Sequence, residues 1–213
     1  MPDAVRASLR ILATHRALFE GGRERGWGVS MDETDIVRVI RAFEASNAKW
    51  ALVGAHAVGL LTEPRATVDF DFIVEGRRLS AVLARLKGEF GDLDALDIGA
   101  AVRLRAIDVD LIRSDNHALF REALERTSIV GDWRIPPPEA IIALKFLSAV
   151  SPWRNRDKRA QDIVDLRTVY HAVGSEALDR AVMVELAGLV YPGAERELED
   201  ILERIDRGEP IPI

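Results

Sequence analysis

The sequence predicts a mixed α/β fold: a small mixed sheet flanked by helices and followed by a helical C-terminal part. Short strand patterns alternate with helical ones in residues 31–135, and only helical patterns follow the proline run 136–138. The glycine-rich stretch 21–28 separates an N-terminal helical pattern from the rest. We therefore expect an N-terminal helix with its linker over 1–30, a core over 31–135 and a helical part over 136–213.

The helices are predicted from apolar residues that recur every three or four positions. Ser30 followed by Glu33 forms a capping-box pattern, which opens a helix that runs to about Ser46. The same periodicity predicts further helices over 3–20, 55–61, 79–90, 116–126, 138–150, 158–172, 175–189 and 194–207.

The strands are predicted from short apolar runs and from alternation. Residues 50–53 form an apolar run that Gly54 ends, and residues 67–74 show the most regular alternation in the chain. Weaker strand patterns cover 101–104 and 107–112.

Composition excludes several classes of protein. The chain has 213 residues and no cysteine, which removes disulfides, iron–sulfur clusters, cysteine-bound zinc and thiol nucleophiles. No apolar run reaches the length of a membrane span, and the N-terminus lacks the apolar core of a secretory signal, so we expect a cytoplasmic protein without membrane contact. Residues 171–213 carry the whole net charge of −6, so residues 1–170 have a net charge of zero. The acidity of the chain therefore does not argue against a phosphate-rich partner that binds residues 1–170.

Two acidic pairs are the clearest chemical signal. Asp69 and Asp71 are expected on one face of the strand over 67–74, and Asp108 and Asp110 on one face of a second strand. If these strands pair, three or four carboxylates converge, and a divalent cation would neutralise them. Carboxylates on adjacent strands are typical of a two-metal phosphoryl-transfer site, although a strand with one solvated face would show the same alternation.

Three further patterns are suited to phosphate. Gly54 lies between an apolar strand and a helix, a junction whose free N–H groups can hold a phosphate, although it could also be only a tight turn. Lys145 lies in an apolar helix, where it could either reach a phosphate or extend a buried stem to solvent. The basic run 154–159 is suited to an RNA backbone or a triphosphate, or is a solvated helix start.

These residues resemble the nucleotidyltransferase superfamily. Its pattern is Gly-Gly or Gly-Ser, then Asp-x-Asp on a strand, then a third Asp on another strand. Here Gly54-Ala55, Asp69-x-Asp71 and Asp110 match it, with Ala55 in place of the second Gly or Ser. Asp110 fits the third position better than Asp108, because two aliphatic residues follow it.

The more specific resemblance is to the AbiEii-like branch, the nucleotidyltransferase toxins of type IV toxin–antitoxin systems. That branch has an Arg-x-Thr before the Asp-x-Asp, a later helix with a lysine, and then a basic and acidic helix. Arg65-x-Thr67, Lys145 and the helix that contains Asp162 and Asp165 are similar to these features. One of the two aspartates is expected to hold Lys145 or a nearby base, or else to form a surface salt bridge. The resemblance covers about residues 48–170.

The resemblance implies a nucleotidyltransferase-type fold and an enzyme that moves a nucleoside monophosphate from an NTP to a hydroxyl. It implies Mg²⁺, or Mn²⁺, held by the catalytic residues Asp69, Asp71 and Asp110. It also implies that the nucleotide is bound by Gly54, Ala55, Arg65, Lys145 and Asp162.

Three acceptors or roles remain open at this stage. A toxin-like enzyme would act on RNA such as tRNA and would have a cognate antitoxin protein as a partner. The same fold could modify a small molecule such as an antibiotic. It could also serve as a non-catalytic or antitoxin-like binding protein.

Overall fold

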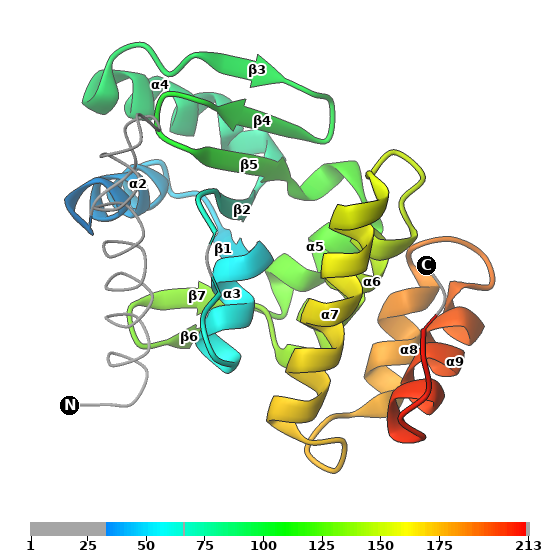
Figure 1. Ribbon diagram of the computed structural model, residues 1–213. Coiled ribbons are helices and arrows are strands. Elements are labelled where there is room, and N and C mark those ends of the chain that lie inside the picture. Colours follow the sequence, from blue (N-terminus) through cyan, green and yellow to red (C-terminus); the bar gives the residue numbers. More distant parts are fainter. Residues whose placement is uncertain (1–32, 66, 212–213) are drawn as a thin grey trace, which may run out of the picture.

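The computed structural model describes residues 33–65 and 67–211, and within these it has the predicted class of fold, a small mixed sheet flanked by helices with a helical part after it (Figure 1). The strands of the main sheet are β1 (Trp50–Val53), β2 (Phe70–Val74), β3 (Ala95–Asp97), β4 (Ala101–Leu104) and β5 (Val109–Arg113). The helices are α2 (Glu33–Ala45), α3 (Gly54–Leu61), α4 (Leu79–Phe90), α5 (Ala118–Glu125), α6 (Pro138–Val150), α7 (Arg156–Val173), α8 (Arg180–Gly188) and α9 (Ala194–Asp206). Short 3₁₀ turns cover Gly76–Arg78 and Ser114–Asn116.

The main sheet is mixed, with strand order β1-β2-β5-β4-β3. β2 runs parallel to β5, and the other neighbours are antiparallel. A separate hairpin of β6 (Ser128–Val130) and β7 (Trp133–Ile135) packs beside β1. The central pair β2–β5 therefore brings together the two strands that carry the acidic residues.

Each face of the sheet buries its own set of apolar side chains. Phe70, Phe72 and Val74 of β2 point to one face, where the core includes residues of α2 and α4. Ile73 points to the other face, together with Ala51 and Val53 of β1, and packs against residues of α5, α6 and α8. Asp71 lies two residues before Ile73 and so faces the helical part.

The helical part begins where the proline run ends. Pro138 occupies the first turn of α6, where a missing N–H costs nothing. α7 and α8 both pack against α6, and α9 packs against α8 (Figure 1). α3 contacts both α6 and α7, so the start of α3 lies between the sheet and the helical part.

Most predicted elements are confirmed, and the exceptions have physical reasons. The strand over 67–74 begins only at Phe70, because β1 ends opposite Asp71 and gives way to α3, so the earlier residues have no antiparallel partner. The strand over 107–112 begins at Val109, because residues 105–108 form the turn from β4. The helix over 175–189 begins at Arg180, where the Asp179 side chain caps it.

Some elements were not predicted, and one prediction cannot be compared. β3, β6 and β7 have three residues each, too few for an alternation pattern. The predicted helix over 3–20, the linker over 21–28 and the predicted capping residue Ser30 lie outside the described residues. Within the described part of the chain, no helix is both long enough and apolar enough to span a bilayer.

Candidate active site

Gly54 and Asp71 lie in contact at the point where β1 turns into α3. Gly54 has a φ of 66°, in the left-handed region that favours glycine. A Cβ atom on Gly54 would lie 2.0 Å from Oδ2 of Asp71, far inside a van der Waals contact. Glycine is therefore required here for two reasons, the backbone conformation and the close approach of the carboxylate.

Asp110 lies beside Asp71 on the neighbouring strand. The two residues are direct partners in the parallel β2–β5 register, so their side chains share one face of the sheet. Arg103 of β4 is the antiparallel partner of Asp110 on the other side. Its guanidinium holds the Asp110 carboxylate in two places, with Nε–Oδ1 at 3.0 Å and Nη2–Oδ2 at 2.8 Å.

The other two aspartates of the predicted pairs lie outside the strands. Asp69 is exposed and directly precedes β2. Asp108 lies in the β4–β5 turn with a φ of 48°, so the prediction that Asp108 and Asp110 share one strand face is wrong. The backbone carbonyl of Asp108 accepts a hydrogen bond of 2.9 Å from the N–H of Phe70, so both acidic segments meet at the same end of the central strands.

Burial and neighbouring negative charges raise the pKa of two of these carboxyl groups, Asp71 and Asp108. Burial raises the pKa of Asp71 to about 6, and the negative charges of Asp110 and Asp69 contribute in the same direction. The pKa of Asp108 is also raised, first by burial and then by Asp69 and Asp110. The negative charges at this end of the sheet therefore repel one another.

Three carboxylates at one end of two adjacent strands are the oxygen donors that Mg²⁺ and Mn²⁺ prefer, and a divalent cation would relieve their repulsion. Yet among residues 33–65 and 67–211, no three acidic or histidine side chains are already gathered around one point. The Arg103 guanidinium donates to both oxygens of Asp110, so it would compete with a metal ion for this carboxylate. The donor set suits a divalent cation, which would share Asp110 with Arg103 or displace Arg103 from it.

Lys145 of α6 faces the carboxylates from the helical part. Its side chain is buried, and its ammonium lies 3.1 Å from Oδ1 of Asp162 and 2.6 Å from Oδ2 of Asp165, both on α7. Lys145 is therefore neither an unpaired ammonium nor a side chain that extends to solvent. The expectation that an aspartate of α7 holds Lys145 is confirmed, and the alternative of a surface salt bridge is wrong, because both carboxylates are buried.

Two arginines complete this charge cluster. Arg65 holds Asp165 with two hydrogen bonds of 2.9 Å, and Arg154 lies 2.5 Å from Asp162. Burial alone would raise the pKa of Asp165, but hydrogen bonds from Arg65 and Lys145 lower it overall. We name Arg65, Lys145, Arg154, Asp162 and Asp165 the α6–α7 charge cluster. Its three cations exceed its two carboxylates by one positive charge.

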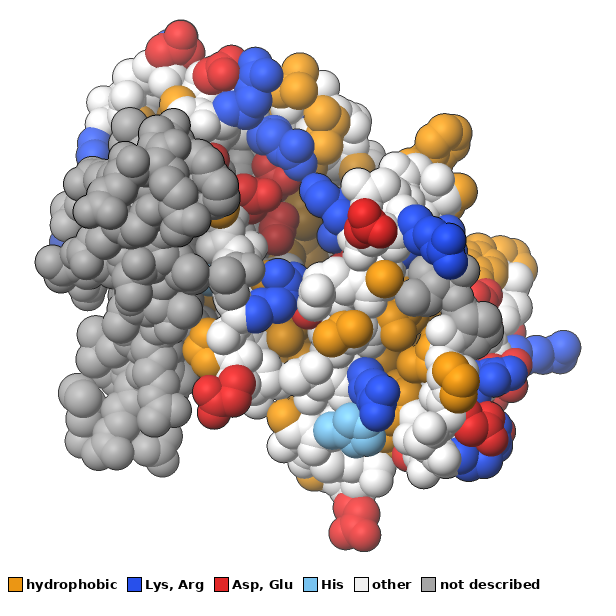
Figure 2. Space-filling model, viewed as in Figure 1, with side chains coloured by type: hydrophobic (Ala, Val, Ile, Leu, Met, Phe, Trp, Pro, Cys, Tyr) orange, Lys and Arg blue, Asp and Glu red, His pale blue; other side chains and the backbone are white. Residues whose placement is uncertain are grey.

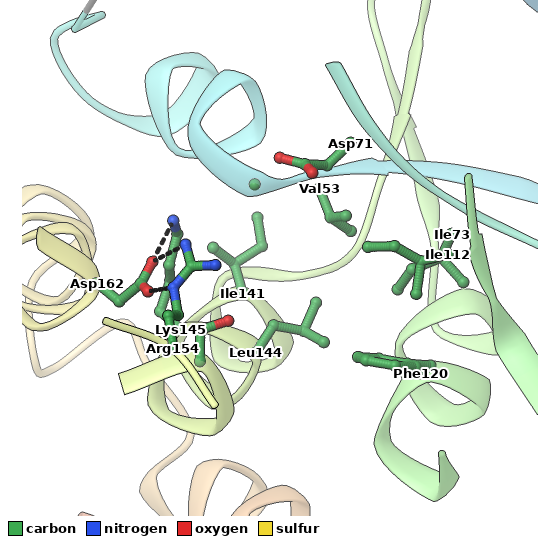
Figure 3. A pocket seen from close by; sticks show the side chains of 12 residues that line it. Val53, Asp71, Ile73, Ile112, Phe120, Ile141, Leu144, Lys145, Arg154 and Asp162 are labelled. Carbon is green, nitrogen blue, oxygen red and sulfur yellow. Dashed lines mark hydrogen bonds and ion pairs between the residues drawn. The ribbon is translucent and has the colours of Figure 1, made fainter. Parts of the chain in front are cut away.

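A cavity of about 150 Å³ lies between the carboxylates and the charge cluster. Asp71 lies at one side of it, and Lys145, Arg154 and Asp162 lie at the other (Figure 3). Most of the other lining side chains are apolar. The lining residues are Val53, Gly54, Asp71, Ile73, Ile112, Phe120, Ile141, Leu144, Lys145, Ser148, Arg154 and Asp162.

Basic side chains lie along part of the surface between the sheet and the helical part. In the space-filling view, Lys and Arg side chains form a line beside a hollow with acidic side chains at its bottom (Figure 2). At the N-terminus of α7, Arg156 and Lys158 are exposed and form no ion pair within the described part of the chain. These side chains would attract an anionic ligand to this part of the molecule.

The predicted nucleotide-binding residues differ in where they lie. Gly54, Lys145 and Asp162 line the cavity. The Ala55 side chain is buried, so only its backbone N–H is available to a ligand. Arg65 does not line the cavity and instead orients Asp165.

Sequence reasoning missed Arg103 and did not single out Arg154. Arg103 lies in an alternating stretch, which places it on a strand face, but only the register shows that this face meets Asp110. Arg154 belongs to the basic run, whose position beside the cavity depends on how α6 and α7 pack. No sequence signal distinguished it from its neighbours.

Comparisons with known proteins reveal similarity of fold only. No family model matches the chain, and no curated protein is similar to it in sequence. Among solved structures, the antibiotic-resistance factor ANT(2″)-Ia in solution is 20% identical, with 82% of this chain and 96% of that chain covered and a TM-score of 0.49. ANT(2″)-Ia in complex with adenylyl-2″-tobramycin is 21% identical, with 78% and 97% covered and a TM-score of 0.49.

An antigenic nucleotidyltransferase-like protein from Paracoccidioides brasiliensis is 20% identical, with 82% of this chain and 88% of that chain covered and a TM-score of 0.44. At these identities the likeness concerns the fold alone. The activity of this chain is therefore argued from its own residues.

Proposed function

We propose that the protein is a metal-dependent nucleotidyltransferase that moves a nucleoside monophosphate from an NTP to a hydroxyl group. One observation carries the proposal. A single cavity has the Asp71 carboxylate on one wall, with Asp110 beside it on the next strand, and the cations Lys145 and Arg154 on the opposite wall. This arrangement suits a metal-bound triphosphate, whose charge is balanced from both sides.

In the proposed reaction, the acceptor oxygen forms a bond to the α-phosphorus of the NTP. The bond from that phosphorus to the bridging oxygen breaks, and pyrophosphate leaves with the electron pair. The proton of the acceptor hydroxyl passes to a carboxylate, for which we propose Asp110. Asp69, Asp71 and Asp110 would hold Mg²⁺ or Mn²⁺, which would supply positive charge at the α-phosphoryl group and the leaving pyrophosphate.

The opposite wall would position the phosphates. Lys145 is held by two carboxylates, which fixes the position of its ammonium without removing the net positive charge of the α6–α7 charge cluster. The Arg154 guanidinium lines the cavity and adds donors for a phosphate oxygen. Gly54 would bring the start of α3 close to the substrate, because it has no side chain in the way.

For the acceptor we propose RNA, as in the toxin-like interpretation of the sequence. The exposed Arg156 and Lys158 favour an anionic acceptor, because a polycationic antibiotic would be repelled by them. A cognate antitoxin protein and a cytoplasmic location belong to the same proposal. A small-molecule acceptor without positive charge is the alternative that the basic surface leaves open.

The test is transfer of label from each α-³²P-labelled NTP, with Mg²⁺, to total RNA, total protein and small-molecule extracts. We expect labelled RNA from the wild-type protein and none from Asp71→Asn or Asp110→Asn. Asp200→Asn is the matched control, because this exposed residue of α9 lies outside the cavity. Label in small molecules only would replace the RNA acceptor, and absence of label in every fraction would favour a non-catalytic binding protein.

A further inference from the structure

Trp153 is unusually exposed. Its relative accessibility is 95%, and the next most exposed large apolar side chain of the described residues, Ile129, reaches 67%. Tryptophan has the largest apolar surface of any side chain and normally buries most of it. Among residues 33–65 and 67–211, no ring contact, ion pair or side-chain hydrogen bond to Trp153 is present.

The backbone around Trp153 is nevertheless firmly held. The N–H of Arg154 donates to the carbonyl of Ser151 at 3.2 Å, which closes a turn with Pro152 and Trp153 at its centre. Directly after the turn, the Asn155 side chain caps α7 by accepting a hydrogen bond of 2.9 Å from the Lys158 N–H. The turn therefore presents the indole outward from a fixed position.

The charges beside Trp153 match a phosphate-bearing ligand. Arg156 and Lys158 lie in the first turn of α7, where the helix dipole disfavours cations. Both are exposed and unpaired within the described part of the chain, and Asp157 is the only acid among residues 154–159. Helix stability does not explain this choice of residues, whereas contact with phosphates does.

This segment lies at the rim of the candidate active site. Arg154, next to Trp153, lines the cavity and pairs with Asp162 inside it. The α6–α7 loop projects freely at one end of the two helices (Figure 1). The indole and the two exposed basic side chains therefore lie within four residues of a side chain that lines the cavity.

We propose that Trp153 is a stacking platform for an unpaired nucleobase of single-stranded RNA, with Arg156 and Lys158 as contacts to the adjoining phosphates. Aromatic side chains bind unpaired bases by stacking, and basic residues follow the backbone, so this pair of features suits a single strand. The inference rests on the proposed RNA acceptor and adds the place where that acceptor is held.

The test measures binding without NTP and with EDTA, so it does not depend on transfer. The probe is a fluorescein-labelled oligoadenylate of about ten nucleotides, a length within the usual site sizes of single-strand binding proteins. Trp153→Ala should weaken binding about tenfold, as expected for the loss of one base–aromatic stack, and Trp153→Phe should restore most of it. Ile129→Ala is the matched control, because it removes an exposed apolar side chain from β6.

Salt dependence separates the two parts of the surface. The slope of log K against log salt should be unchanged in Trp153→Ala and should fall by about 1.4 in the double variant R156Q/K158Q, since each phosphate contact of a single strand adds about 0.7. Wild-type affinity in Trp153→Ala would overturn the proposal. Equal binding of ATP or of duplex RNA, or binding of anionic vesicles in place of RNA, would overturn it as well.

The outcome is independent of the proposed reaction. If Trp153-dependent RNA binding is found but no NTP is ever transferred, the stacking platform stands and the nucleotidyltransferase proposal fails. If RNA is labelled equally well by Trp153→Ala and binds to it with wild-type affinity, the enzyme proposal stands and the platform is wrong.

Discussion

Replacing Arg103 by methionine is expected to strengthen the binding of Mn²⁺ to the protein. In the structure the Arg103 guanidinium holds both oxygens of Asp110, one of the three proposed metal ligands. This ion pair therefore competes with a metal ion for the Asp110 carboxylate. Methionine keeps much of the aliphatic stem on β4 and removes only the competing charge.

The size of the effect follows from the exposure of the pair. The Arg103 side chain is 46% exposed and that of Asp110 13%, so solvent screens the interaction on one side. Ion pairs of this kind contribute about 0.5–1 kcal/mol, near the upper end for exposed pairs because the contact is bidentate. Removal of this competition should lower the Kd for Mn²⁺ about two- to fivefold.

The assay is Mn²⁺ binding in the absence of nucleotide, followed by electron paramagnetic resonance of the free ion. Arg105→Met is the matched control, because Arg105 directly follows β4 and pairs with Asp94 but with none of the proposed ligands. Asp110→Asn should weaken Mn²⁺ binding. If Arg103→Met binds Mn²⁺ no better than Arg105→Met while remaining folded, Arg103 does not compete with a metal at Asp110.

Three further predictions concern the walls of the cavity. Asp71→Asn should stabilise the metal-free protein by up to about 3 kcal/mol in urea unfolding at pH 8, because the folded-state pKa of Asp71, about 6, lies above the unfolded value of 3.8. This gain in the free energy of unfolding should shrink below pH 6 and vanish below about pH 4. A gain that stays constant with pH would contradict the raised pKa. Lys145→Met should lower the free energy of unfolding by about 3 kcal/mol, because Asp162 and Asp165 then lack one of their buried positive partners. Adding Asp162→Asn to this variant should recover part of the lost stability. Gly54→Ala should lower the free energy of unfolding by about 1–2 kcal/mol from the positive φ alone. It should also abolish nucleotidyl transfer, because the added Cβ would displace the Asp71 carboxylate. An active Gly54→Ala protein would refute the packing described for this site.

Elements governed by local sequence were predictable. The helices over 79–90 and 138–150 and the strand over 50–53 match the structure at both ends, because periodicity, proline and glycine act within a few residues. The ends of β2 and β5 were not, because they depend on where a neighbouring strand stops. Asp108 is an example. Its spacing from Asp110 is typical of one strand face, but Asp108 lies in the tight turn between β4 and β5 and therefore outside the sheet.

The site was predictable in its residue types and less so in its contacts. Asp71 and Asp110 lie side by side, as expected if their strands pair. The competition of Arg103 for Asp110 depends on the register of β4, which no spacing in the sequence specifies. The two buried partners of Lys145 depend on how α7 packs on α6, so sequence alone left three interpretations of this lysine open.

The most direct test of the proposed reaction compares ATP labelled at the α-phosphate with ATP labelled at the γ-phosphate, and the other three NTPs in the same way, with RNA as acceptor and Mg²⁺ present. Nucleotidyl transfer predicts that the α-label enters the RNA and the γ-label appears in pyrophosphate, and that both signals are lost in Asp71→Asn. Transfer of the γ-label to the RNA, or equal α-label transfer by Asp71→Asn, would contradict it.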